Sequence, residues 1–175
     1  MSFCAPIKDT SLSPKARSKD VAEKVSSRAV NNAYALLRIR PRSEFEIRER
    51  LRTKGYDGAL IDEIVTGLKG RGDIDDQKFA DFWVNSRMHL NPVGDVVLRH
   101  ELKAKGIAAA VIDAALEAKS KAYDEYELAL AMAVERFERL KKLDRQKAMK
   151  RLYDFLLRRG FGYDTVRRIV EKLAK

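Results

Sequence analysis

The chain has 175 residues, 45% of them apolar and 35% charged, a composition that excludes a wholly disordered protein. Lysine and arginine outnumber aspartate and glutamate by 36 to 26, and the resulting net charge of +10 favours a polyanionic partner, nucleic acid first. The single cysteine, Cys4, excludes an internal disulfide framework and a cysteine-based metal cage. We interpret Cys4 as a plain reduced thiol.

The chain carries no sequence signal for a membrane or for secretion. No apolar run approaches the ~20 residues that span a bilayer. Lys8, Asp9, Lys15 and Arg17 interrupt the N-terminal region where a signal peptide would have its apolar core. We therefore expect a cytoplasmic protein without membrane contact.

The first 28 residues are rich in serine and lysine and carry a net charge of +3. They predict a flexible basic tail, with helix beginning near Arg28. Three units follow, at residues 29–72, 73–122 and 123–175, with net charges of +3, −1 and +5. The positive charge is therefore concentrated at the two ends of the chain, on either side of a nearly neutral middle.

Each unit is predicted to begin with an amphipathic helix. In the middle unit the apolar face of this helix has Phe79, Phe82 and Trp83. Helix boundaries are marked by local signals. Ser43 with Glu46 fits a capping box, and Asp144 is placed as an N-cap. We also predict Asp164 as an N-cap, and breaks after the first helix at Pro41 and Pro92.

Three glycines reveal the repeat: Gly55, Gly106 and Gly160. A leucine stands four residues before each glycine, and a large apolar residue follows it directly. This is the pattern of a helix that ends on a left-handed glycine, with an apolar contact across the turn. An apolar stripe then follows in each unit, although the middle copy loses it at Lys119. The sequence therefore predicts an all-α fold of tandem three-helix repeats in an elongated array.

A search for catalytic groups finds none. His89 and His100 have no metal-ligand or triad spacing with a partner. Gly70-Arg71-Gly72 follows a helix rather than a strand, so we interpret it as a linker. Asp73, Asp75 and Asp76 lack the twelve-residue calcium pattern and are better explained by N-capping of the next helix. We expect no enzymatic activity, no metal and no cofactor.

The basic residues recur at equivalent positions of the units. Arg48 matches Arg99, and Arg52 matches Lys103. Within each unit the two basic residues are four positions apart, so they line one helical face. The third unit departs at both positions and has other arginines nearby. A repeating basic stripe suits a long, periodic, anionic partner. The candidate contact residues are Arg48, Arg52, Lys54, Arg99, Lys103, Lys105, Arg151, Arg158, Arg159, Arg167 and Arg168.

Three motifs resemble those of one family. The stretch Gly72-Asp73-Ile74-Asp75-Asp76-Gln77-Lys78-Phe79-Ala80, with Phe82 and Arg87, resembles the most recognisable part of RecX, the bacterial regulator of the RecA recombinase. Ser43-Glu44-Phe45-Glu46-Ile47 through Gly55 is similar to the family's first unit, and Phe155 through Phe161 to its last. One departure is Gly94-Asp95-Val96-Val97, where the family often has two basic residues.

The resemblance implies a regulator without enzymatic activity, built from tandem three-helix units in a curved shape. Its partners would be the RecA filament and the single-stranded DNA within it, and it would restrain ATP hydrolysis, strand exchange and the SOS response. We expect a monomer that takes part in the control of DNA repair and recombination. The alternative from the charge alone is a non-specific DNA-binding protein that competes for single-stranded DNA.

Overall fold

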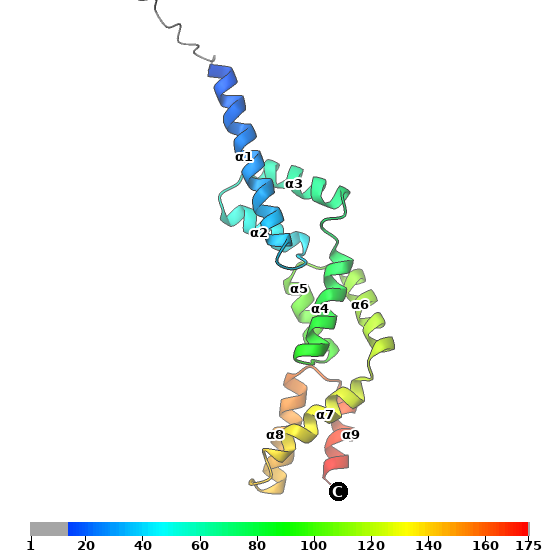
Figure 1. Ribbon diagram of the computed structural model, residues 1–175. Helices are drawn as coiled ribbons and strands as arrows, with labels where there is room; N and C mark the ends of the chain where they lie inside the picture. The colour runs from blue at the N-terminus through cyan, green and yellow to red at the C-terminus, as the bar shows by residue number, and fades with distance from the viewer. Residues whose placement is uncertain (1–13, 175) are drawn as a thin grey trace, which may run out of the picture.

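The computed structural model describes residues 14–174 and, within them, contains helices and connecting turns but no strand. The described residues form nine helices that follow one another along an elongated, bowed molecule (Figure 1). The helices are α1 (Pro14–Leu37), α2 (Glu44–Thr53), α3 (Gly58–Gly70), α4 (Asp76–Leu90), α5 (Asp95–Ala104), α6 (Ala109–Ala122), α7 (Glu125–Glu138), α8 (Arg145–Arg158) and α9 (Tyr163–Leu173). The predicted all-α tandem repeat is confirmed.

The N-terminal segment differs from the prediction. Helix α1 begins at Pro14 rather than near Arg28, so half of the expected tail is helical. The segment from Pro14 contains alanine, lysine, arginine and glutamate, which favour helix even without an apolar face, and proline is well tolerated in a helix's first turn. Residues 1–13, including Cys4, lie outside the described residues.

Each set of three helices has its own hydrophobic core. The first is centred on Ile47, Leu51 and Leu68. The second is centred on Phe79, Leu98 and Ile112, and the third contains the fully buried Leu152, Leu156 and Ile169. The extensive helix packing among the described helices lies within α1–α3, α4–α6 and α7–α9. We call these sets units 1, 2 and 3.

The predicted helix stops are confirmed. Gly55, Gly106 and Gly160 have φ angles of +82°, +75° and +81°. In unit 1 the amide of Tyr56 donates to the carbonyl of Leu51 at 3.3 Å, while that of Gly55 donates to Arg52 at 2.9 Å. These two bonds define the predicted turn. Gly72, which we had interpreted as part of a linker, ends α3 in the same way with φ +75°.

Gly55→Val is expected to lower the free energy of unfolding by about 1–2 kcal/mol, because an L side chain is strained at positive φ. A Cβ at Gly55 meets nothing within 4 Å, so the expected loss comes from the positive φ and not from a clash of the added Cβ. Urea unfolding followed by circular dichroism measures it. A variant as stable as the parent would contradict the left-handed stop.

Most of the predicted N-caps are present. The Ser43 hydroxyl accepts from the amide of Glu46 at 3.1 Å, Asp75 caps α4, and Asp144 caps α8. The Asp164 prediction is wrong, because Gly162 precedes the first turn of α9 and its amide donates to the Glu125 carboxylate at 2.9 Å. A side chain from α7 thus replaces the expected local cap.

The units meet through turns. The stop turn that ends α5 packs on the start of α2: the Ser43 hydroxyl donates to the Lys105 carbonyl at 2.8 Å, and a Cβ on Gly106 would lie 2.5 Å from the Cβ of Phe45. We call this contact joint 1–2. Gly94 occupies the position equivalent to Ser43 at the start of α5, and there its backbone amide can take the place of the hydroxyl as donor.

The second contact, joint 2–3, repeats the arrangement. The stop turn that ends α8 packs on the start of α5, where the amide of Gly94 donates to the Arg159 carbonyl at 2.9 Å and the amide of Val96 to the Gly160 carbonyl at 3.4 Å. The two joints use equivalent positions of successive units. A repeated joint of this kind accounts for the elongated shape of the array (Figure 1).

Candidate functional site

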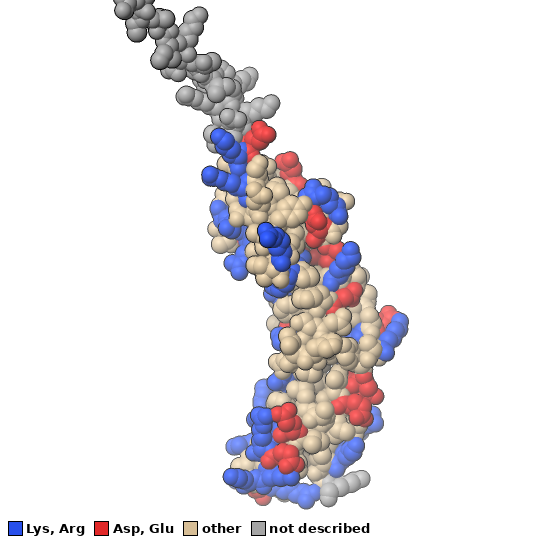
Figure 2. Space-filling model, viewed as in Figure 1, with Lys and Arg blue, Asp and Glu red and all other residues tan. Residues whose placement is uncertain are grey.

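The charged side chains are unevenly distributed on the surface. In the view of Figure 2, lysine and arginine gather over the upper and lower parts of the molecule, while the middle is mainly uncharged. This matches the net charges of +3, −1 and +5 for the three predicted segments. A polyanion lying along this face would therefore meet its strongest attraction at units 1 and 3.

Two of the predicted contact residues occupy equivalent ion pairs inside their units. Arg48 of α2 pairs with Asp62 of α3, and also with Glu44 at 2.8 Å. Arg99 of α5 pairs in the same way with Asp113 of α6 at 2.5 Å. The recurrence of these arginines in the sequence thus has a structural cause, since each one ties the second helix of its unit to the third.

Arg52 and Arg167 are paired within their own helices. Arg52 contacts Glu49, and Arg167 lies 3.7 Å from Glu171. All four side chains are largely exposed, and exposed pairs of this kind contribute about 0.2–1 kcal/mol. Both arginines can therefore exchange an internal carboxylate for an external anion at little cost.

Five of the remaining predicted residues form a set that we call the open cations. Among the side chains that the structure describes, those of residues 22–174, no carboxylate lies within ion-pair distance of any of them. Arg168 stacks on the ring of Tyr126 at 4.8 Å, and the others project from exposed positions. These side chains can contact an anion without breaking an internal pair. The open cations are Lys54, Lys103, Arg151, Arg158 and Arg168.

Lys105 belongs to joint 1–2. Its ammonium lies 2.7 Å from the Glu46 carboxylate and 4.9 Å from the centre of the Trp83 ring. Arg40 also pairs with Glu46, at 2.9 Å. Burial raises the pKa of the Glu46 carboxyl, but hydrogen bonds from Arg40 and Lys105 outweigh it and hold that pKa below its usual value. Lys105 therefore supports the joint between units 1 and 2.

The two carboxylates in the first turn of α2, Glu44 and Glu46, predict that acid destabilises the protein. The pKa of Glu44 is also lowered, by its hydrogen bond from Lys69, so both carboxyls bind protons more tightly in the unfolded chain than in the folded one. Their stabilising effect is complete above the ordinary value of 4.5 and is lost as the pH falls through the lowered folded values. Urea titrations from neutral to acid pH should show this loss.

Glu46→Gln should make the free energy of unfolding less dependent on pH in the acid range, because it removes one of the two carboxyls. Glu63→Gln, at an exposed position of α3, serves as the matched control and should leave the slope unchanged. Equal slopes for the parent and Glu46→Gln would contradict the assignment.

Lys119 explains the break in the apolar stripe of the middle unit. Its side chain is only 3% exposed, and its ammonium lies 2.5 Å from the Asp95 carboxylate at the start of α5. The aliphatic stem is buried while the charge reaches a partly exposed partner. Asp95, one of the departures from the family pattern, therefore has an ion-pairing role within unit 2.

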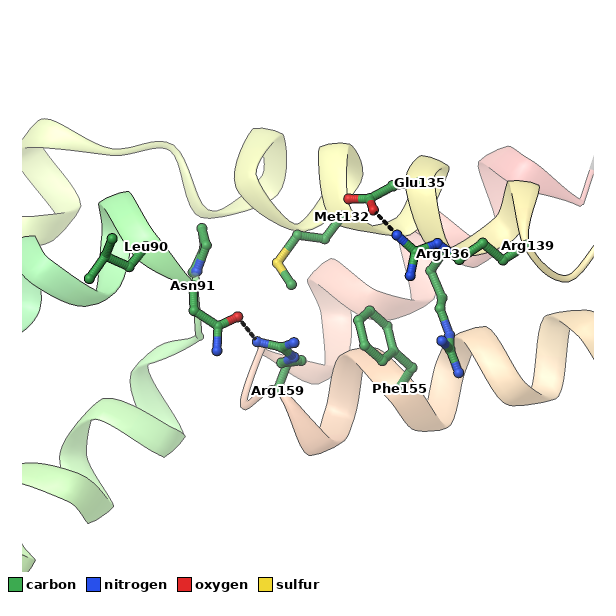
Figure 3. A pocket seen from close by; sticks show the side chains of 9 residues that line it. Leu90, Asn91, Met132, Glu135, Arg136, Arg139, Phe155 and Arg159 are labelled. Carbon is green, nitrogen blue, oxygen red and sulfur yellow. Dashed lines mark hydrogen bonds and ion pairs between the residues drawn. The ribbon is translucent and has the colours of Figure 1, made fainter.

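Arg159 lies in a cleft between units 2 and 3 that the sequence did not reveal (Figure 3). Its guanidinium is 5.4 Å from the centre of the Phe155 ring and donates to Asn91. Arg136 of α7 stacks on the same ring at 5.2 Å. Arg136 was not predicted, because no pattern along the sequence shows that α7 places it beside α8.

Two kinds of site are absent from the part of the chain that the structure describes. Histidine, cysteine and acidic side chains form no group of three or more suited to holding a metal ion there. Among the described helices, none combines the length and the apolar character needed to cross a membrane.

Comparison with known families decides the identity. The models of the first, second and third three-helix domains of RecX match residues 29–68, 75–116 and 123–170. The chain belongs to the RecX family. The matched ranges follow the three units in order, and the resemblance carried by the sequence motifs is confirmed.

Relatives with the same domains align over most of the chain. Regulatory protein RecX of Chlorobium phaeobacteroides is 35% identical over 153 residues, which cover 87% of this chain and 98% of the relative. Regulatory protein RecX of Chlorobium limicola is 31% identical over 153 residues, with 87% and 94% covered. These relatives are named as regulatory proteins, which is consistent with a regulatory role for this chain.

Solved RecX structures share the fold. A crystal structure of regulatory protein RecX superposes with a TM-score of 0.78 at 22% identity and covers 95% of this chain and 81% of that one. RecX from Lactobacillus salivarius gives a TM-score of 0.73 at 24% identity, covering 85% and 96%. The RecX fold thus extends over all three units.

Proposed function

We propose that this RecX-family protein modulates, and mainly inhibits, the RecA recombinase by binding along the RecA filament on single-stranded DNA. In this role it restrains ATP hydrolysis, strand exchange and the SOS response, and so takes part in the control of DNA repair and recombination. It acts in the cytoplasm as a monomer, without catalysis and without a cofactor.

The observation that carries this proposal is the elongated array with open cations at both ends. Lys54 lies in unit 1, while Arg151, Arg158 and Arg168 lie in unit 3. A long molecule with separated basic regions suits a long anionic polymer, because several weak contacts add up to strong binding. Two other predicted contact residues, Arg52 and Arg167, can bind the polymer after giving up a weak ion pair within their own helix. The rest contribute positive charge from half-buried positions: Arg48, Arg99, Lys105 and Arg159.

The alternative is a non-specific DNA-binding protein that competes for single-stranded DNA. The net charge of +5 in the third segment favours it. The two functions differ in what the protein must recognise: the filament as an assembly, or DNA alone. They therefore predict different concentration dependences.

The deciding experiment measures ATP hydrolysis by RecA on single-stranded DNA while this protein is titrated at near-physiological salt. A parallel titration follows binding to the same DNA without RecA. Inhibition at concentrations well below those that coat bare DNA supports regulation of the filament. If inhibition appears only as bare DNA becomes coated, the competing DNA-binding function is the correct one.

A further inference from the structure

The cleft between units 2 and 3 has the features of a binding site for a protein segment. It has a volume of about 320 Å³ and is lined by the end of α4, by the turn after it, and by α7 and α8. Leu90, Met132 and Phe155 contribute apolar surface, and Arg136 and Arg159 contribute positive charge. Apolar and cationic groups therefore converge in one cleft from two units (Figure 3).

The central element is a phenyl ring with a guanidinium on either side. Figure 3 shows Arg159 and Arg136 flanking Phe155, with their guanidinium carbons 5.4 Å and 5.2 Å from the ring centre. Stacking on the ring holds each guanidinium plane in place while its N–H groups remain free to donate at the edges. Such a fixed pair is suited to carboxylate recognition.

The positive charge in the cleft is not balanced from within. Neither Arg136 nor Arg159 lies within ion-pair distance of a carboxylate among the described side chains of residues 22–174. Glu135, the carboxylate that lines the cleft, pairs with Arg139 instead. The Nε of Arg136 is buried and has no hydrogen-bond partner among the described residues. Two guanidinium charges without a carboxylate partner attract an anionic ligand to the cleft.

The mouth of the cleft adds aliphatic surface. Leu90 is 82% exposed, an unusual position for a large apolar side chain at the end of a helix. It lines the cleft on one side and, on the other, a shallow depression formed with Trp83, Ser86 and Arg87. Arginine, methionine and aromatic side chains gathered in one place are typical of the centres of protein–protein interfaces.

A nucleic-acid strand fits these features less well. Single strands bind by stacking their bases on open aromatic faces. Phe155 is the aromatic ring that lines this cleft, and a guanidinium stacks on each side of it. The large exposed apolar side chain at the mouth, Leu90, is aliphatic and offers no face for stacking a base.

We propose that this cleft binds a short acidic segment of a partner protein, with carboxylates paired with Arg136 and with Arg159 on the two sides of Phe155 and a neighbouring aliphatic side chain packed on Leu90 and Met132. The inference rests on the proposed function only in requiring a protein partner. Its test needs no RecA and measures no ATP hydrolysis. The peptide can therefore fail to bind while RecA is still inhibited, and the two failures can be told apart.

The experiment uses the full chain labelled with nitrogen-15 and a blocked hexapeptide of alternating glutamate and leucine as the probe. Titration should shift the side-chain Nε–Hε signals of Arg136 and Arg159 in a saturable way. The same peptide with glutamine in place of glutamate should leave both signals unmoved. A peptide with serine in place of leucine should bind more weakly, because it lacks the aliphatic contact with Leu90.

Variants locate the site. Arg136→Gln should weaken peptide binding by about tenfold. Lys141→Gln removes one charge from an exposed position just after α7 and should leave binding within about twofold. Leu90→Ser changes a side chain that is 82% exposed, so it should weaken binding while leaving thermal unfolding unchanged, even if Arg136→Gln fails to fold.

Two outcomes would overturn the proposal. The first is that millimolar glutamate–leucine peptide shifts neither the Arg136 nor the Arg159 Nε–Hε signal. The second is a shift of the same signals by an oligothymidylate of about 15 nucleotides at lower concentration than by the peptide, which would make the cleft a nucleic-acid site.

Discussion

Gly94→Ala is expected to open joint 2–3 while leaving the cores of the three units folded. A Cβ at Gly94 would lie 2.0 Å from the Gly160 carbonyl oxygen and 2.2 Å from its carbon. These are backbone atoms of a hydrogen-bonded turn, so they cannot rotate away as a side chain would. The φ of Gly94 is −76°, which any residue adopts, and the cost therefore arises from the contact between units.

We expect a loss of about 1–3 kcal/mol at this joint, as for an added methyl group in a packed interior. Small-angle X-ray scattering should show a changed radius of gyration, and thermal unfolding should separate into more than one transition. Far-ultraviolet circular dichroism at low temperature should stay near that of the parent, because each unit keeps its own core.

The matched control is Gly58→Ala at the start of α3. A Cβ there meets nothing within 4 Å, and alanine favours helix over glycine. This variant should be as stable as the parent or slightly more stable. If Gly94→Ala gave the same scattering curve and the same unfolding as the parent, the joint would not depend on close backbone contact.

Reversing the charge of two open cations in unit 3 is expected to weaken inhibition of RecA more than any other change considered. Arg151 and Arg158 lie seven residues apart on α8, on one face of the helix, and both are exposed. The double variant Arg151→Glu with Arg158→Glu should raise the concentration needed for half-inhibition of RecA by at least about tenfold, since attraction to the polyanion becomes repulsion.

The control changes the net charge equally but on unit 2, which is nearly neutral. Lys78 and Lys121 are 75% and 74% exposed in α4 and α6. Lys78→Glu with Lys121→Glu should shift half-inhibition much less than the α8 pair. Equal losses in the two double variants would mean that overall charge, rather than the surface of unit 3, governs binding.

The parts of the fold that follow from local chemistry could be predicted from the sequence. The stop glycines were found because a left-handed helix end needs only glycine and the apolar pair around it. The Asp164 error could have been avoided from the same repeat. Helices α3, α6 and α9 each begin three residues after the preceding stop glycine, which places the third N-cap at Gly162.

The parts that depend on contacts between helices were missed. Neither Arg136 nor the contact of Gly94 with Gly160 has a signature along the chain. The pairing of Arg48 with Asp62, by contrast, could have been predicted. Arg48 and Arg99 stand seven residues before successive stop glycines, and Asp62 and Asp113 stand seven residues after them. At the N-terminus, the polar composition favoured a tail, although the residues from Pro14 onward include strong helix formers.

The joints also give the molecule a direction. In both of them the later unit contributes its stop turn and the earlier unit contributes the start of its second helix, so the two ends of the array are chemically different. At the unit 1 end the stop turn at Gly55 is open, with nothing within 4 Å of a Cβ built there. At the unit 3 end it is the start of α8, at Arg145, that has no later unit to contact it, because no unit follows α9 among the described residues. A strand with two different ends can hold such an array in two orientations that are not equivalent. In only one of them does unit 3 lie ahead of unit 1 along the strand.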